Sequence, residues 1–130
     1  MTTQVPPERL LELTETLVAA YNAKDFERLA QMLSPNLKFC HHNRGFAFDT
    51  RDEFIDVLRT FASDIVPDRR LGPAVRVIAS GHTVLREQTW GGTARTDIAG
   101  MAKAGEHFTI DLATVLAFKG ETVVEYHDYG

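Results

Sequence analysis

The stretch that decides the fold lies at the end of the chain, where residues 107–129 read HFTIDLATVLAFKGETVVEYHDY. Two runs of strand-forming residues, His107–Phe118 and Thr122–Tyr129, stand on either side of the turn pair Lys119-Gly120. Runs rich in β-branched and aromatic residues that flank a glycine turn are typical of a β-hairpin. The sequence therefore predicts that the chain ends in two long antiparallel strands.

A second hairpin is predicted just before the last one. Residues 75–79 alternate in polarity, Ser80-Gly81-His82 form a turn, and a partner strand runs from Thr83 to about Trp90. Gly91 and Gly92 then permit a bend or bulge in a curved sheet. A polar crossing over residues 93–105 leads to the final hairpin.

Helical patterns fill the first half of the chain. Apolar residues with helical spacing predict a first helix over Pro7–Asn22. Asp25 is placed to cap a second helix that Ser34-Pro35-Asn36 ends, a short strand follows at Leu37–His42, and Thr50 opens a capping box for a third helix. Helices first and antiparallel strands afterwards predict an α+β fold, with the helices packed on one face of the sheet.

Composition predicts one domain and argues against some classes of binding partner. The 130 residues, 44% of them hydrophobic, suffice for one core, so residues 1–130 are expected to form a single domain. A net charge of −4 without a basic stretch argues against nucleic acid and membrane surfaces as partners. The lone Cys40 fits a reducing, cytoplasmic location, and we expect neither a leader nor a membrane span.

Two stretches resemble known families. Residues 118–129, FKGETVVEYHDY, resemble the C-terminal signature of SnoaL-like polyketide cyclases and limonene epoxide hydrolases, and residues 78–87, IASGHTVLRE, resemble their central hairpin. The resemblance implies the cystatin-like, nuclear transport factor 2-like fold that ketosteroid isomerases share: a cone-shaped barrel with three N-terminal helices on a curved, mainly antiparallel sheet. It also implies a homodimer that pairs through the sheet. Nuclear transport factor 2 itself binds protein and catalyses nothing, so the fold alone does not imply an enzyme.

The family patterns point to Asp128 as the leading candidate for catalysis. Asp128 resembles the last aspartate of the epoxide hydrolase Asp-Arg-Asp triad, but Gln88 and Trp90 stand where the arginine and the other aspartate would be. Epoxide hydrolysis by that mechanism is therefore not expected. SnoaL-like cyclases, which pair an acidic residue near the terminal strand with pocket histidines, are the closest pattern, and His41 and His42 lie where ketosteroid isomerases place a general base.

Strand geometry refines these candidates. Alternation places Asp128 on one face with Tyr126 and Val124, and a carboxyl in an apolar pocket has a raised pKa that suits a general acid or base. His41 and His42 point to opposite faces of their strand, so at most one enters the pocket. Each of these residues could equally be a hydrogen-bonded structural group.

Other residues are candidates for the pocket wall and rim. Trp90 would give a flat wall and Gln88 a hydrogen-bond donor, although Trp90 is at least as often core. Arg44 could meet an anionic group while Phe46 covers it, the alternative being an ordinary surface loop. Asp111 ranks second among the acids because an inward-facing, protonated carboxyl could stabilise an oxyanion.

These observations predict a cofactor-independent acid–base enzyme for a small hydrophobic carbonyl compound. Isomerisation or aldol-type cyclisation would use Asp128 or a histidine as base, with Asp111, Gln88 or Tyr21 as enolate stabiliser and Tyr126 in contact with the substrate. The five histidines show no metal-ligand spacing, so no metal is expected. The alternative is a non-catalytic module of the same fold that uses the pocket to bind a small molecule or to dimerise.

Overall fold

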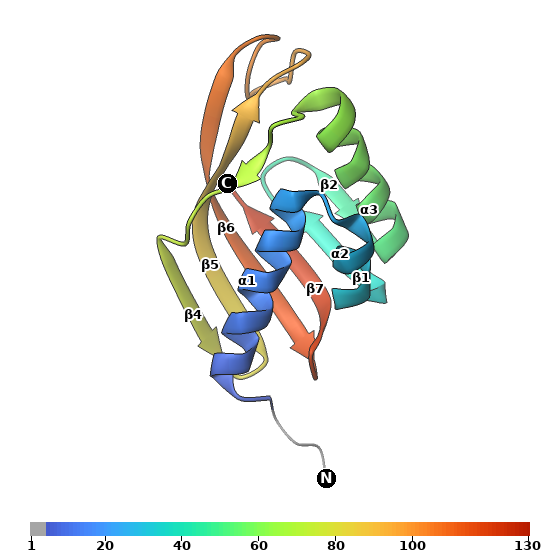
Figure 1. Cartoon of the computed structure of the whole chain (residues 1–130), viewed down its shortest axis with the longest axis vertical. Helices are drawn as coiled ribbons and strands as arrows, with labels where there is room; N and C mark the ends of the chain where they lie inside the picture. Colours follow the sequence, from blue (N-terminus) through green and yellow to red (C-terminus); the bar gives the residue numbers. More distant parts are fainter. Residues whose placement is uncertain (1–4) are drawn as a thin grey trace.

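The computed structural model describes residues 5–130 as three helices and a seven-stranded sheet (Figure 1). Within that range the helices are α1 (Pro7–Ala23), α2 (Phe26–Met32) and α3 (Arg51–Thr60), which a π-helical turn over Phe61–Ile65 extends. The strands are β1 (Leu33–His41), β2 (Phe46–Phe48), β3 (Arg70–Leu71), β4 (Arg76–Ser80), β5 (Thr83–Thr93), β6 (His107–Lys119) and β7 (Thr122–Tyr129). The predicted α+β class is confirmed.

The sheet is mixed and open. Its order is β2-β1-β7-β6-β5-β3, and β4 pairs with the first half of β5. All pairs are antiparallel except β1 with β7, which run parallel. The helices lie over one face of the sheet: α1 lies in front of the central strands, and α3 lies beside β1 and β2 (Figure 1). No helix of residues 5–130 covers the other face.

The predicted helix caps are present. The Asp25 carboxylate accepts a hydrogen bond from the backbone N–H of Arg28 at 3.1 Å, and the Thr50 hydroxyl accepts one from the N–H of Glu53 at 3.3 Å. Thr50 also donates to the Glu53 carboxylate at 2.9 Å. Such side chains satisfy donors that the first helical turn leaves unpaired.

The prediction for the end of the second helix is wrong in detail. The helix ends at Met32, and Ser34-Pro35-Asn36 belong to strand β1, which begins at Leu33. A proline has no N–H to donate, which a strand tolerates where its pairing is interrupted. The pairing of β1 with β7 is irregular between Leu33 and Lys38, around Pro35. The proline segment therefore follows the end of the helix closely but does not prevent a strand.

Two predictions about the sheet are corrected. Strand β7 shifts its register against β6 between the Phe118–Val123 and Ala117–Glu125 pairs. Val123 is therefore fully buried, and Val124 does not share the face of Tyr126 and Asp128 as predicted. Of the bend or bulge predicted at Gly91-Gly92, the bulge is absent, because β5 pairs with β6 without a break from Thr83 to Thr93. A Cβ on Gly91 would overlap the backbone carbonyl of Phe108, so the glycine permits close strand packing rather than a bulge.

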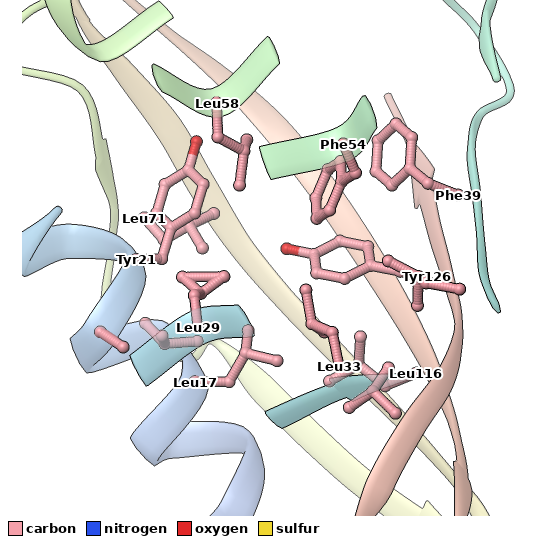
Figure 2. Close-up of a cluster of buried hydrophobic side chains, with 14 of the residues drawn as sticks. Leu17, Tyr21, Leu29, Leu33, Phe39, Phe54, Leu58, Leu71, Leu116 and Tyr126 are labelled. Carbon is pink, nitrogen blue, oxygen red and sulfur yellow. The ribbon is translucent and has the colours of Figure 1, made fainter. Parts of the chain in front are cut away.

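The core lies between the helices and the covered face of the sheet. Leucines from α1, α2, β1 and β6 pack beside two tyrosines and Phe54 (Figure 2). The Phe39 ring stacks on Phe54 at 4.3 Å between centroids and tilts against Tyr126 at 5.4 Å. These aromatic side chains close one end of the core and form the wall of a cavity. No helix in residues 5–130 has the length and apolar character to span a membrane.

Candidate functional site

A cavity of about 90 Å³ opens between α3 and the covered face of the sheet. Its walls are mostly apolar and aromatic: Phe39, Phe48, Phe54, Val57, Leu58, Phe61, Leu71, Trp90, Met101, Ile110 and Leu112. The polar side chains that reach it are those of Asp128, His41, Arg44, Tyr21 and Tyr126. Few polar groups in an apolar recess are typical of a small-molecule site.

Asp128 is the acidic group of the cavity. It lies near the end of β7, where its Cα pairs with that of His41 on β1 and with that of Thr114 on β6. Burial raises the pKa of the Asp128 carboxyl to about 7, although a hydrogen bond from Thr114 and the neighbouring His127 both oppose the shift. A carboxyl with this pKa exchanges a proton readily at neutral pH.

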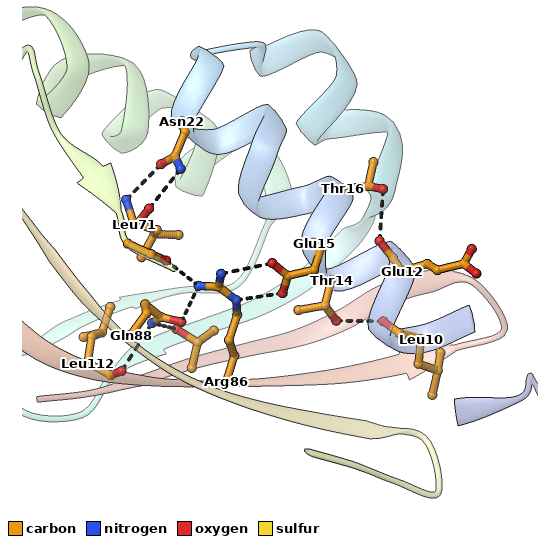
Figure 3. A network of polar contacts seen from close by, with 12 residues as sticks. Leu10, Glu12, Thr14, Glu15, Thr16, Asn22, Leu71, Arg86, Gln88 and Leu112 are labelled. Carbon is orange, nitrogen blue, oxygen red and sulfur yellow. Dashed lines mark hydrogen bonds and ion pairs between the residues drawn. The ribbon is translucent and has the colours of Figure 1, made fainter. Parts of the chain in front are cut away.

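A chain of hydrogen bonds connects Asp128 to helix α1. Thr114 donates its hydroxyl proton to Asp128 Oδ1 at 2.7 Å and accepts from Gln88 Nε2 at 3.1 Å. Gln88 Oε1 in turn accepts from Arg86 Nη1 at 2.9 Å. Arg86 completes the chain with a two-point ion pair to Glu15 on α1, at 2.8 and 3.0 Å (Figure 3). Gln88 is therefore buried but does not line the cavity.

The two adjacent histidines lie on opposite sides of the sheet. His41 lines the cavity, and its Nδ1 is buried without a hydrogen-bond partner among residues 5–130. Burial lowers the pKa of His41, and the nearby charges of Arg44 and His42 lower it further. Its neutral imidazole is the form that can accept a proton.

His42 belongs to a cluster on the outer side. Its Nε2 is 2.9 Å from Nδ1 of His127, and its ring stacks on Tyr129 at 4.3 Å. His127 Nε2 is in turn 2.9 Å from the Glu125 carboxylate. His42 directly follows β1, is exposed, and packs its ring against His127 and Tyr129 rather than in the cavity. The proposed use of His42 as a base in the cavity has no geometric support.

Tyr21 brings a phenol to the cavity from α1. Its hydroxyl oxygen accepts a hydrogen bond from Trp90 Nε1 at 2.7 Å. The indole N–H can only donate, so the hydroxyl proton of Tyr21 is not used in this bond. Burial raises the pKa of Tyr21 to about 12, and the phenol is a neutral donor at pH 7.

Arg69 packs its guanidinium on the face of the Tyr21 ring. The guanidinium carbon is 3.7 Å from the centre of the Tyr21 ring, and Nη1 donates to the Tyr21 carbonyl at 2.9 Å. The side chain is only 2% exposed. A cation on the face of a phenol ring favours its ionised form, and here it partly opposes the effect of burial on the Tyr21 pKa.

Arg44 and Phe46 form one edge of the cavity. Arg44 lies in the turn between β1 and β2, lines the cavity, and has a buried Nε without a partner in the described part of the chain. Phe46 lies at the start of β2, is 40% exposed, and packs edge-to-face on Phe61 at 6.3 Å. The alternative of an ordinary surface loop does not describe Phe46–Phe48, which form a strand that pairs with β1.

Asp111 lies outside this arrangement. It is exposed on β6 and its neighbour Leu112 is buried, so its carboxyl points away from the cavity. Sequence reasoning missed Thr114, Glu15 and Arg69. Thr114 pairs with Asp128 only because of a register shift in the final hairpin, and Arg69 follows Asp68 in a segment without any strand or helix signal.

No three His, Cys, Asp or Glu side chains in residues 5–130 gather closely enough to hold a metal ion. The chemistry that the cavity's own residues offer is proton transfer. Asp128 and His41 can accept a proton, Tyr21 can donate a hydrogen bond, and Arg44 supplies a positive charge at the edge.

The comparison that decides the family is a sequence match. The SnoaL-like domain matches residues 14–126, which is most of the chain. The chain belongs to the SnoaL-like domain family. No curated protein matches it in sequence.

Solved structures share the fold of this SnoaL-like chain. A candidate polyketide cyclase from Xanthomonas campestris superposes with a TM-score of 0.82 at 19% identity, covering 95% of this chain and 91% of that one. A candidate SnoaL-like polyketide cyclase from Jannaschia gives 0.81 at 14% identity, with 98% and 90% covered. An LEH-like epoxide hydrolase from M. tuberculosis gives 0.73 at 17% identity, with 95% and 83% covered. At these identities the likeness establishes the nuclear transport factor 2-like cone fold.

Proposed function

We propose that this SnoaL-like protein is an acid–base enzyme that moves a proton next to the carbonyl of a small compound, without a cofactor. The observation that carries the proposal is the partly buried Asp128 carboxyl, whose pKa is raised to about 7, in a cavity with mostly apolar walls. Keeping an ionisable carboxyl in such surroundings is costly, and packing alone would avoid it.

In the proposed reaction Asp128 removes a proton from the carbon beside the carbonyl. Its Oδ1 accepts from Thr114, so Oδ2 is the oxygen left to act as the base. Tyr21 donates a hydrogen bond to the oxygen of the developing enolate, and the bond it accepts from Trp90 strengthens it as a donor. Protonated Asp128 then returns the proton to another carbon of the enolate, which completes an isomerisation. In an aldol-type cyclisation the enolate carbon would instead attack a second carbonyl of the same compound, and Asp128 would protonate the alkoxide that this forms.

Exchange of α-protons for deuterium tests this proposal without knowledge of the natural substrate. Cyclopentanone, pyruvate and levulinate would be incubated in D₂O, and the loss of their α-proton signals followed by NMR. Wild type should accelerate exchange of at least one of them, and Asp128→Asn should lower that rate roughly a hundredfold or more. Asp111→Asn, at an exposed position, should match wild type.

The second candidate is a non-catalytic binding module, which the predominance of apolar side chains in the cavity favours. It predicts that compounds bind in the cavity while α-proton exchange stays at the rate of buffer alone. An equal exchange rate in wild type and Asp128→Asn would therefore favour the binding module.

We also propose that the protein forms a homodimer through the uncovered face of the sheet. Ile78, Leu85 and Val115 form an apolar row there, since Leu85 pairs with both of the others across β4 and β6. Ile78 is 53% exposed. Sedimentation should show a dimer in wild type and a monomer in Leu85→Lys. The cytoplasmic location predicted from Cys40 stays a prediction.

A further inference from the structure

Arg44 is a cation at the cavity without an acidic partner. No carboxylate in residues 5–130 lies within 4 Å of its guanidinium, and its Nε is buried without a hydrogen bond. Arg86, by contrast, is held by both oxygens of Glu15. An arginine that lacks such a partner presents its planar N–H groups to whatever enters the cavity.

The groups around Arg44 leave its charge unneutralised. His41, beside it, is uncharged at neutral pH because burial and Arg44 itself lower the pKa of the imidazole. Phe46 and Phe61 form the adjoining wall of the cavity, and their aromatic rings offer no hydrogen bond that could replace water around a bound anion. A carboxylate is a group that arginine binds well, through two parallel hydrogen bonds.

We propose that the ligand of this cavity is a short aliphatic carboxylic acid, with its carboxylate on Arg44 and its apolar chain directed inward toward Asp128. The inference rests on the proposed function, which it deepens to a small oxo acid as the substrate class. The cavity volume of about 90 Å³ is small, which favours a short chain over a fused ring system.

Isovalerate and its amide, isovaleramide, test this inference because they differ in charge and hardly in shape. Binding to wild type would be measured by calorimetry, with the acid expected to bind at least tenfold more tightly than the amide. Arg44→Gln should remove that preference and leave the amide unchanged. Arg28→Gln is the matched control, because Arg28 is an exposed helix residue outside the cavity lining.

The outcomes separate this inference from the proposed function. Equal binding of acid and amide, a preference that survives Arg44→Gln, or no binding of either compound would overturn it. Asp128→Asn should keep the preference for the acid while losing proton exchange. If the preference is present but exchange never occurs, the binding inference stands and the enzymatic proposal is the one that fails.

A second inference comes from the polarity of the hydrogen-bond chain behind Asp128. Arginine has only donors, so Gln88 must present its carbonyl oxygen to Arg86. The Gln88 amide nitrogen then faces Thr114 and the carbonyl of Leu112. Thr114, which receives that N–H, can direct its own proton only to Asp128 Oδ1. Arg86, Gln88 and Thr114 are at most 5% exposed, so water does not compete for these bonds.

We infer that this chain fixes the reactive proton of Asp128 on Oδ2 and keeps the carboxylate available near neutral pH. Gln88 and Thr114 are positioning residues, since they act on the substrate only through Asp128. The other titratable groups around Asp128 are His41 on β1, His127 and Tyr126 on β7, and Tyr21 on α1. None of them is altered in the test variants.

The test compares Thr114→Val, Thr114→Ser and Gln88→Glu by the pH dependence of α-proton exchange. Valine removes the bond that favours the carboxylate, so the midpoint of the profile should move up by about half to one pH unit. In Gln88→Glu the new carboxylate would pair with Arg86 and accept the Thr114 proton instead, which should move the midpoint in the same direction. Thr114→Ser should keep the wild-type midpoint.

A role in packing alone would change the rate or the melting temperature but not the midpoint. An unchanged midpoint in both Thr114→Val and Gln88→Glu would therefore overturn the inference. If a variant does not fold, the ¹³C resonance of Asp128 in the soluble variant of the pair gives the same midpoint and decides the question.

Discussion

The side chains on the two sides of the β1–β7 pair are similar in type but differ in how completely they are hydrogen-bonded. On the outer side, His42, His127 and Glu125 bond to one another at 2.9 Å, and Tyr129 stacks on His42. On the cavity side, His41 Nδ1 has no partner in the described residues, and Asp128 keeps one oxygen outside the Thr114 bond. Unsatisfied polar groups at a cavity indicate a site for a ligand, whereas saturated ones on the surface indicate ordinary stabilisation.

The largest expected difference concerns stability above neutral pH. The folded pKa of Asp128, about 7, exceeds the ordinary value of 3.8, so the folded state holds this proton more tightly than the unfolded chain. The contribution of Asp128 to stability therefore falls as pH rises from about 4 to about 7. Asp128→Asn should be more stable than wild type at pH 8, on the order of 2 to 4 kcal/mol, and equal to it near pH 4. Urea unfolding at both pH values measures this difference.

Activity should follow the opposite trend. If the Asp128 carboxylate is the base, exchange of α-protons should increase with pH and reach half its maximum near pH 7. At pH 5 the rate should be about one hundredth of the plateau, because the ionised fraction of the carboxyl group falls about tenfold for each pH unit below its pKa. A profile that is flat between pH 5 and 8 would exclude Asp128 as the base.

The smallest effects separate the adjacent histidines. His41→Gln should lower exchange by roughly tenfold, because it replaces a proton acceptor in the cavity. His42→Gln should leave exchange within about twofold of wild type and cost about 0.5 to 1.5 kcal/mol of stability, since it loses the bond to His127. The reverse pattern would place the chemistry on the outer side of the sheet.

Much of the fold could be predicted from the sequence because its signals are local. The Thr50 capping box and the final strand over Thr122–Tyr129 lie where predicted, and the first helix differs by one residue at its end. The parallel pairing of β1 with β7 and the short strand β3 were not predicted, because both depend on partners distant in the sequence. Sequence patterns carry no information about which distant strands meet.

The candidate site was only partly predictable for the same reason. Alternation allowed at most one of His41 and His42 to face the cavity, and which one depends on the side that the helices cover. The hydrogen bond between Thr114 and Asp128 depends on the register shift in β7, which no sequence pattern predicts. Tyr21 and Trp90 were named separately, and only the packing of α1 on β5 brings them together.

The proposed function depends above all on the pKa of Asp128, and carbon NMR of the side-chain carboxyl measures it directly. With ¹³C-labelled aspartate, we expect one carboxyl that titrates near pH 7, well above the other aspartates, and that disappears in Asp128→Asn. A titration of Asp128 near its ordinary value of about 4 would contradict the proposed function, because the carboxyl would then be solvated and unsuited to proton transfer in an apolar cavity.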